Sequence, residues 1–299
     1  MEPKHNSFLS RIIHAAQPWK LLAGFLFYAL GVSIVYYLGE PIDLRVYALG
    51  QAGVTCFQAS SYFLTRYYDA IRPAGKEARL YSPQERREVV GLLQIALSLL
   101  TVGMVMVLLL LVNKDISPGG GMVLMFIFAL FLLYGVPPVR LVYSGYGELV
   151  EAIVLANLVP AFGFALQYGS LHRLLGMITF PLTGLYLAML IVGSFRSYSE
   201  DMKRLNGTLL IRIGWERGIV LHNVLILTAY LLIAAAALLG LPWGLTWPAL
   251  LLLPLGAFQV WMMSRMADGA KPQWRLMTLA AVALPVLTAY FLIFSLMME

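Results

Sequence analysis

The chain has 299 residues, of which 60% are apolar and only 12% are charged, and its mean hydropathy is +0.79. A soluble globular domain carries about 25% charged residues, so this composition excludes that class. Apolar runs of about 20 residues, the length of a membrane-crossing helix, recur along the chain. They are too long for the alternating strands of a membrane barrel. The sequence therefore predicts an all-α, polytopic membrane protein, and the single cysteine, Cys56, excludes an internal disulfide.

In chain order, residues 1–17 are predicted to form an amphipathic segment on the membrane surface. Nine spans follow within one integral membrane domain that covers residues 1–299. We expect them at approximately 18–39, 44–64, 84–112, 121–137, 148–168, 175–195, 218–240, 246–263 and 276–297. The fourth ends at Pro137-Pro138, because proline stops a helix. The third begins with Ser82-Pro83-Gln84-Glu85, a capping box with proline at the first helical position.

The distribution of basic residues predicts the orientation. The N-terminal segment and the loops after spans 2, 4, 6 and 8 carry 18 of the 21 Lys and Arg residues, which leaves only Arg45, Lys114 and Arg173 (21 − 18 = 3) for the other side. The cytoplasmic side carries the excess of positive charge, so we expect a cytoplasmic N-terminus and an external C-terminus, in a cell (inner) membrane. The net charge of +6 is thereby explained without a nucleic-acid partner.

Two polar segments, after spans 2 and 6, carry the candidate chemistry. Thr65 and Asp69 are one helical turn apart, as are Ser197 and Asp201, so each pair shares a helix face. Asp69 and Asp201 could hold Mg²⁺ against a diphosphate, because Mg²⁺ takes one or two carboxylates together with substrate oxygens. Six basic residues are candidates to neutralise that diphosphate: Arg66, Arg72, Lys76, Lys203, Arg204 and Arg212. The alternative is that these are ordinary charges of a cytoplasmic face.

Both segments resemble motifs of one family. SFRSYSEDMKRLNGTLLIRIG, residues 194–214, resembles the second aspartate-rich motif of the UbiA superfamily of intramembrane prenyltransferases, and FQASSYFLTRYYDA, residues 57–70, resembles the first. Asp201 and Asp69 fall in matching places. Ser197 and Arg66 stand where the family has aspartates, and a cation at position 66 would repel Mg²⁺.

A third segment, RLVYSGYGELVEAI at residues 140–153, resembles the signature at the start of the fifth span in this family. It is most similar to the 1,4-dihydroxy-2-naphthoate polyprenyltransferase branch, which serves menaquinone biosynthesis. The resemblance implies a nine-helix UbiA-type bundle. It also implies Mg²⁺-dependent transfer of a polyprenyl group from its diphosphate to an aromatic, quinone-precursor-like acceptor.

The resemblance also implies roles for individual residues. The catalytic candidates are Asp69, Glu200 and Asp201, with Asp69 and Asp201 as the metal ligands. The candidates for the acceptor or prenyl pocket are Gln58, Tyr67, Tyr143, Glu148 and Tyr198. Glu148 and Glu151, one turn apart, could bind acceptor hydroxyls or hydrogen-bond to neighbouring helices, and the sequence leaves both open.

A rival from another class remains open. The reduced number of aspartates favours a catalytically inactive relative that binds lipid or quinone as a subunit of a membrane complex. The retained Asp69 and Asp201 and the dense basic loops favour the enzyme. The expected partners are a polyprenyl diphosphate, an aromatic acceptor and the lipid bilayer.

Overall fold

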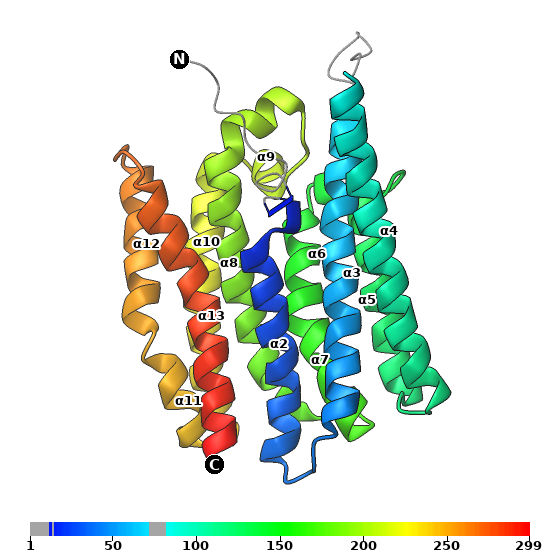
Figure 1. Cartoon of the computed structure of the whole chain (residues 1–299). Helices are drawn as coiled ribbons and strands as arrows, with labels where there is room; N and C mark the ends of the chain where they lie inside the picture. Colours follow the sequence, from blue (N-terminus) through cyan, green and yellow to red (C-terminus); the bar gives the residue numbers. More distant parts are fainter. Residues whose placement is uncertain (1–11, 14, 72–81) are drawn as a thin grey trace.

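The computed structural model describes residues 12–13, 15–71 and 82–299, and every regular element in those ranges is helical. Most of the predicted surface segment at residues 1–17, together with Arg72 and Lys76, lies outside the described residues. The long helices run between the two ends of one bundle, as Figure 1 shows. In chain order the α-helices, long and short, are α2 (Pro18–Tyr37), α3 (Leu44–Ile71), α4 (Pro83–Val112), α5 (Pro118–Gly135), α6 (Gly147–Ile153), α7 (Val159–Tyr168), α8 (Arg173–Arg204), α9 (Leu209–Ile213), α10 (Trp215–Leu238), α11 (Trp243–Leu250), α12 (Leu253–Ala267) and α13 (Trp274–Met298).

Eight helical segments of the described chain are long and apolar enough to cross a membrane. Two of them are composite. α6 and α7 are joined through a wide turn, η2 (Val154–Leu158), and α11 and α12 together form the segment Trp243–Ala267. The one predicted span that is not among these eight segments is the second, expected at 44–64. It corresponds to α3, which is 28 residues long but less apolar. Its buried face carries several polar side chains: Gln51, Gln58, Ser60, Ser61 and Thr65. A polytopic helical membrane architecture is confirmed, while the count of nine spans stays a prediction.

Two helices extend beyond the predicted spans. The spans are expected at approximately 44–64 and 175–195, whereas α3 continues to Ile71 and α8 to Arg204. The predictions stopped where the apolar residues stop, but a helix that leaves the apolar layer keeps its backbone hydrogen bonds and can continue into water. Both aspartate-rich segments are therefore helix ends, and this fixes the directions in which Asp69 and Asp201 project.

The capping box at the start of α4 is confirmed. The Ser82 hydroxyl accepts a hydrogen bond from the Glu85 amide at 3.2 Å, and the Glu85 carboxylate accepts one from the Ser82 amide at 3.0 Å. We predict that Ser82→Ala lowers the free energy of unfolding by about 1 kcal/mol, because the Glu85 amide loses its hydrogen-bond acceptor. Reversible unfolding in mixed micelles measures the change. Ser117→Ala is the comparison, because Ser117 caps α5 without a reciprocal carboxylate. An equal loss of stability in both variants would show that the capping box of α4 adds nothing to a simple N-cap.

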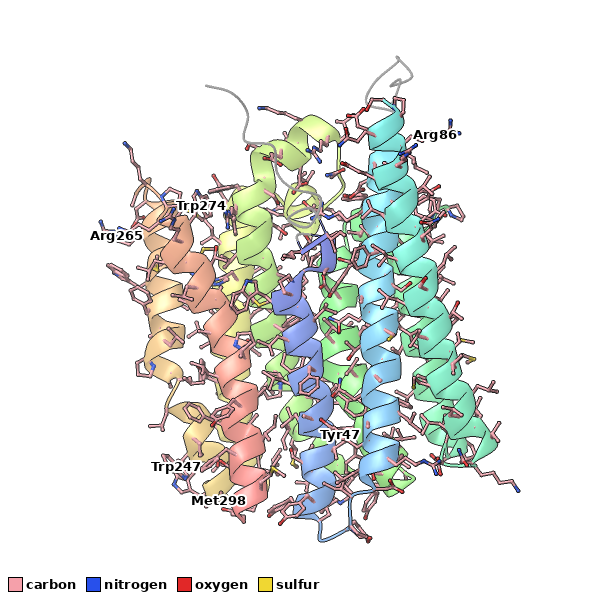
Figure 2. All side chains as sticks on the ribbon, viewed as in Figure 1. Tyr47, Arg86, Trp247, Arg265, Trp274 and Met298 are labelled. Atoms are coloured by element: carbon pink, nitrogen blue, oxygen red, sulfur yellow. The ribbon has the colours of Figure 1, made fainter. Side chains whose placement is uncertain are left out.

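The two ends of the bundle differ in charge. Figure 2 labels Arg86 and Arg265 at one end, where α4 and α13 begin, and Trp247 and Met298 at the opposite end. At the end near Met298, Arg45 forms an ion pair with Asp115 at 3.0 Å. Helix α2 begins at the end opposite to the one where α13 stops (Figure 1). The start of α2 and the end of α13 thus lie at opposite ends of the bundle, and the orientation of the chain in a membrane stays a prediction.

Candidate functional site

A cavity of about 690 Å³ opens among α2, α3, α5, α6, α8 and α13 at the end of the bundle where α8 stops. Its wall combines charged groups with apolar side chains from α8 and α13, such as Met189 and Val282. The charged residues that line it are Lys20, Arg66, Glu148, Glu151, Arg196 and Asp201. This concentration of charge in a membrane-embedded bundle marks the cavity as the candidate functional site.

Asp201 lies on the cavity wall near the end of α8. The Ser197 hydroxyl, one turn earlier on the same face, donates to one carboxylate oxygen at 2.6 Å. The chain then turns back at Leu205, which adopts the left-handed conformation with φ 53°, and the Asn206 side-chain amide donates to the other oxygen at 2.9 Å. Both donors are neutral, so Asp201 keeps its negative charge uncompensated by a cation in these contacts.

Asp69 is held differently. Its carboxylate accepts hydrogen bonds from Arg140 at 2.6 Å and from the Tyr143 hydroxyl at 2.9 and 3.0 Å. Burial, and then the Asp69 charge, raise the pKa of Tyr143, so this hydroxyl stays protonated and donates. Tyr143 lines the cavity and Asp69 does not. In this structure Asp69 is therefore the ion-pair partner of Arg140 and anchors the 3₁₀ turn η1 (Leu141–Tyr143), and its role as a metal ligand stays a prediction.

Glu148 ties three elements together at the cavity wall. Its two oxygens accept hydrogen bonds from the Ser194 hydroxyl at 2.7 Å and from the Leu209 backbone amide at 3.1 Å. Ser194 belongs to α8, and Leu209 opens the short helix α9. The Glu148 carboxylate thus fixes the chain reversal after α8 against α6, while it also faces the cavity.

The predicted basic residues separate into two groups. Arg66 lines the cavity, as does Arg196, which was not among the predicted phosphate-binding residues. Within the described part of the chain, neither guanidinium forms a salt bridge or a hydrogen bond. Arg212 instead packs 4.2 Å from the Tyr146 ring centroid, and Lys203 and Arg204 are exposed away from the cavity lining.

The remaining predicted residues lie beside the cavity. Tyr67 packs edge-on against Tyr68, and Tyr198 packs edge-on against Trp215. None of these rings lines the cavity, and Glu200 is exposed outside it. Tyr67 and Tyr198 thus pack against neighbouring aromatic rings beside the cavity.

Gln58 is buried behind the cavity wall. Its amide donates to the Lys20 carbonyl at 2.8 Å and to the Tyr62 hydroxyl at 3.1 Å. It therefore connects α3 to the start of α2 and supports the polar cluster described next.

The most deeply buried charge in the cavity wall is Glu151, whose residue is 4% exposed. Its Oε2 accepts hydrogen bonds from Lys20 Nζ at 2.8 Å and from the Tyr134 hydroxyl at 2.8 Å. Its Oε1 accepts one from the Tyr62 hydroxyl at 2.9 Å. Four helices, α2, α3, α5 and α6, thus meet at one carboxylate.

Comparison with known proteins identifies the fold. Residues 24–282 match the UbiA prenyltransferase family. The chain belongs to this family. A search of curated protein sequences gave no match.

Solved structures of UbiA homologs share the fold of this chain. A UbiA homolog from Archaeoglobus fulgidus bound to GPP and Mg²⁺ superposes with a TM-score of 0.69 at 16% identity, covering 97% of this chain and 100% of that one. The same homolog bound to DMAPP and Mg²⁺ gives 0.67 at 16% identity, with 95% and 99% covered. An apo UbiA homolog from Aeropyrum pernix K1 gives 0.60 at 14% identity, with 93% and 98% covered. At these identities the likeness shows the fold.

The carboxylates of this UbiA chain fit a metal held jointly with a substrate. The described residues contain no group of three or more His, Cys, Asp or Glu side chains that could hold an ion. Asp69 is occupied by Arg140, whereas Asp201 faces the cavity with only neutral partners. Since Mg²⁺ is often bound through one or two carboxylates and completed by phosphate oxygens and water, Asp201 fits as a single protein ligand.

Sequence reasoning missed the Lys20 contribution entirely and left the role of Glu151 open. The only available signals were a lysine at the start of the first apolar run and two glutamates one turn apart at the start of the fifth. The partners are 131 residues apart in the chain, and no local pattern reveals which distant residue a helix face meets.

Proposed function

We propose that this protein transfers a polyprenyl group from its diphosphate to an aromatic acceptor of the quinone-precursor type. The observation that carries the proposal is the cavity itself. The guanidinium groups of Arg66 and Arg196, which have no ion-pair partner among the described residues, and the carboxylate of Asp201 share a space of about 690 Å³ with the apolar side chains of α8 and α13. A diphosphate and an isoprenoid tail require this combination of charged and apolar surroundings.

The periodicity of α8 supports an ordering of these groups along the cavity. Asp201, Ser197, Ser194 and Leu190 all line it at helical spacing. Asp201 lies seven positions after Ser194, which corresponds to about 10 Å along a helix axis, at about 1.5 Å per residue. A diphosphate bound at Asp201 would therefore leave its allylic carbon near the level of Ser194, with the tail against Leu190 and beyond.

The metal belongs to this proposal. The Archaeoglobus fulgidus homolog was solved with GPP or DMAPP and Mg²⁺, and we expect the same class of ligands here. Asp201 would hold the ion together with diphosphate oxygens, and Arg66 and Arg196 would neutralise remaining phosphate charge. The metal, when bound, stabilises the charge that develops on the departing diphosphate. We expect the cavity end of the bundle to face the cytoplasm, where the basic loops lie.

One observation favours the second candidate, a non-catalytic subunit that binds lipid or quinone. Asp69 is bound to Arg140 at 2.6 Å, and Arg66 lines the cavity at a position where the resemblance expects an aspartate. The protein thus brings fewer free carboxylates to the cavity than the family motifs imply. The two candidates differ in one measurable property, which is the release of diphosphate.

The deciding experiment measures diphosphate release by purified protein given geranylgeranyl diphosphate, 1,4-dihydroxy-2-naphthoate and Mg²⁺. We expect Asp201→Ala to lower the rate at least tenfold, because the cavity loses its proposed metal ligand, and chelation with EDTA to lower the wild-type rate similarly. Asp268→Ala, an exposed carboxylate at the end of α12, is the matched control and should stay within twofold. Background release from both the wild type and Asp201→Ala would favour the non-catalytic candidate.

A further inference from the structure

The Lys20–Glu151 pair lies deeper in the cavity than the groups proposed to bind diphosphate. Tyr62, which donates to Glu151, precedes Arg66 by four residues on α3, so the pair lies about 6 Å further along that helix, at about 1.5 Å per residue. Both Lys20 and Glu151 line the cavity. This depth is close to the level at which the allylic carbon of a bound prenyl diphosphate would lie.

The pair retains hydrogen-bonding capacity toward the cavity. An ionised carboxylate offers about four acceptor positions, and the described residues fill three of those of Glu151, two on Oε2 and one on Oε1. Lys20 has three N–H donors, of which Glu151 takes one, and its side chain is 25% exposed. An acceptor position on Oε1 and two donors on Nζ are therefore available where Glu151 and Lys20 face the cavity.

The contribution of the Lys20–Glu151 pair to stability does not by itself account for its presence in the bundle. Ionised groups inside a membrane protein are costly, and a buried ion pair often contributes no more than apolar side chains of the same size. Two tyrosine hydroxyls, of Tyr62 and Tyr134, and the Gln58 amide are arranged around it as supports. Such a supported pair beside a cavity is suited to hold a ligand group in a fixed orientation.

We propose that Lys20 and Glu151 form the subsite for a hydroxyl group on the aromatic acceptor, an inference that rests on the proposed prenyl transfer. The hydroxyl donates its proton in a hydrogen bond to Glu151 Oε1 and accepts a hydrogen bond from Lys20 Nζ. A phenolic or naphtholic hydroxyl satisfies both groups, whereas an ether or an unsubstituted ring leaves the carboxylate position without a donor. The pair thereby selects hydroxylated aromatic rings and orients the ring beside the allylic carbon.

The test is a binding measurement without any prenyl diphosphate. The probes are 1-naphthol and its methyl ether, 1-methoxynaphthalene, titrated by calorimetry into the full-length protein in detergent and corrected for partition into empty micelles. We expect the wild type to bind 1-naphthol at least tenfold more tightly than the ether. Glu151→Gln should reduce this ratio to less than threefold, because an amide oxygen is a weaker acceptor than a carboxylate. Asp268→Asn, the same carboxylate-to-amide change at an exposed position at the end of α12 and outside the cavity lining, should keep the ratio.

Thermal melting shows whether each variant is folded. If Glu151→Gln does not fold, the double variant Lys20→Met/Glu151→Gln, in which both charges are removed, takes its place and should show the same loss of discrimination. Equal binding of the two probes by the wild type, or an unchanged ratio in the folded Glu151 variant, would overturn the subsite. Because no transfer takes place in this assay, its failure is distinct from a failure of the diphosphate-release experiment.

Discussion

Replacing Lys20 with methionine should lower the free energy of unfolding by about 3 kcal/mol, the lower part of the range for breaking a buried ion pair. Glu151 would keep only the two hydroxyl donors, Tyr62 and Tyr134, around a carboxylate whose side chain is 3% exposed. The lower part of the range applies because Lys20 itself is 25% exposed to the cavity. Unfolding in mixed micelles, followed by circular dichroism, measures the effect.

The second charge provides the internal control for this prediction. In Lys20→Met/Glu151→Gln no ionised group is left in the pair, and we expect the double variant to recover most of the lost stability. Lys271→Met removes an exposed lysine in the loop between α12 and α13 and should change stability by less than about 0.5 kcal/mol. If the single and double variants lose the same amount, the loss comes from the packing of the lysine stem and not from an uncompensated carboxylate.

The architecture could be predicted from the sequence because it depends on local properties. Apolar length located the helices, and the Ser82 capping box was readable because its two partners are three residues apart. The helix ends at Ile71 and Arg204 could not be read from apolar length, since the last turns of α3 and α8 are polar and still helical. The backbone hydrogen bonds of these last turns are the same as in an apolar helix, because they do not depend on side-chain polarity.

The candidate site was predictable only in part, because the environment of each residue depends on partners that are distant in the sequence. Asp69 and Asp201 look equivalent in the sequence, each one turn after a hydroxyl-bearing residue. Arg140, 71 residues beyond Asp69, makes them different by neutralising the first. Asp201 instead meets Ser197 and Asn206, both on its own segment. A helix pattern gives the face on which a side chain lies, and the fold decides which group that face meets.

Gly31→Ala should destabilise the protein by about 3 kcal/mol, because the α2 backbone at Gly31 packs directly against the α7 backbone at Pro160. A methyl group at Gly31 would overlap the carbonyl oxygen of Pro160 and lie 2.7 Å from its carbonyl carbon. Both are backbone atoms, so no side-chain rotation relieves the overlap and the two helices must separate. Small residues at helix crossings are a main source of close packing in membranes, where apolar surface gains nothing by leaving lipid.

Gly119→Ala is the matched control for this substitution. It lies in the first turn of α5, where an added methyl group meets no atom within 4 Å, and it should be neutral or slightly stabilising because alanine favours the helix. The comparison also bears on the site, since α2 is the helix that brings Lys20 to Glu151. If the helices separate in Gly31→Ala, discrimination between 1-naphthol and its ether should weaken along with stability. A fully stable Gly31→Ala protein would mean that α2 is not held against α7 at this distance, and the position of Lys20 in the cavity would then lose its structural basis.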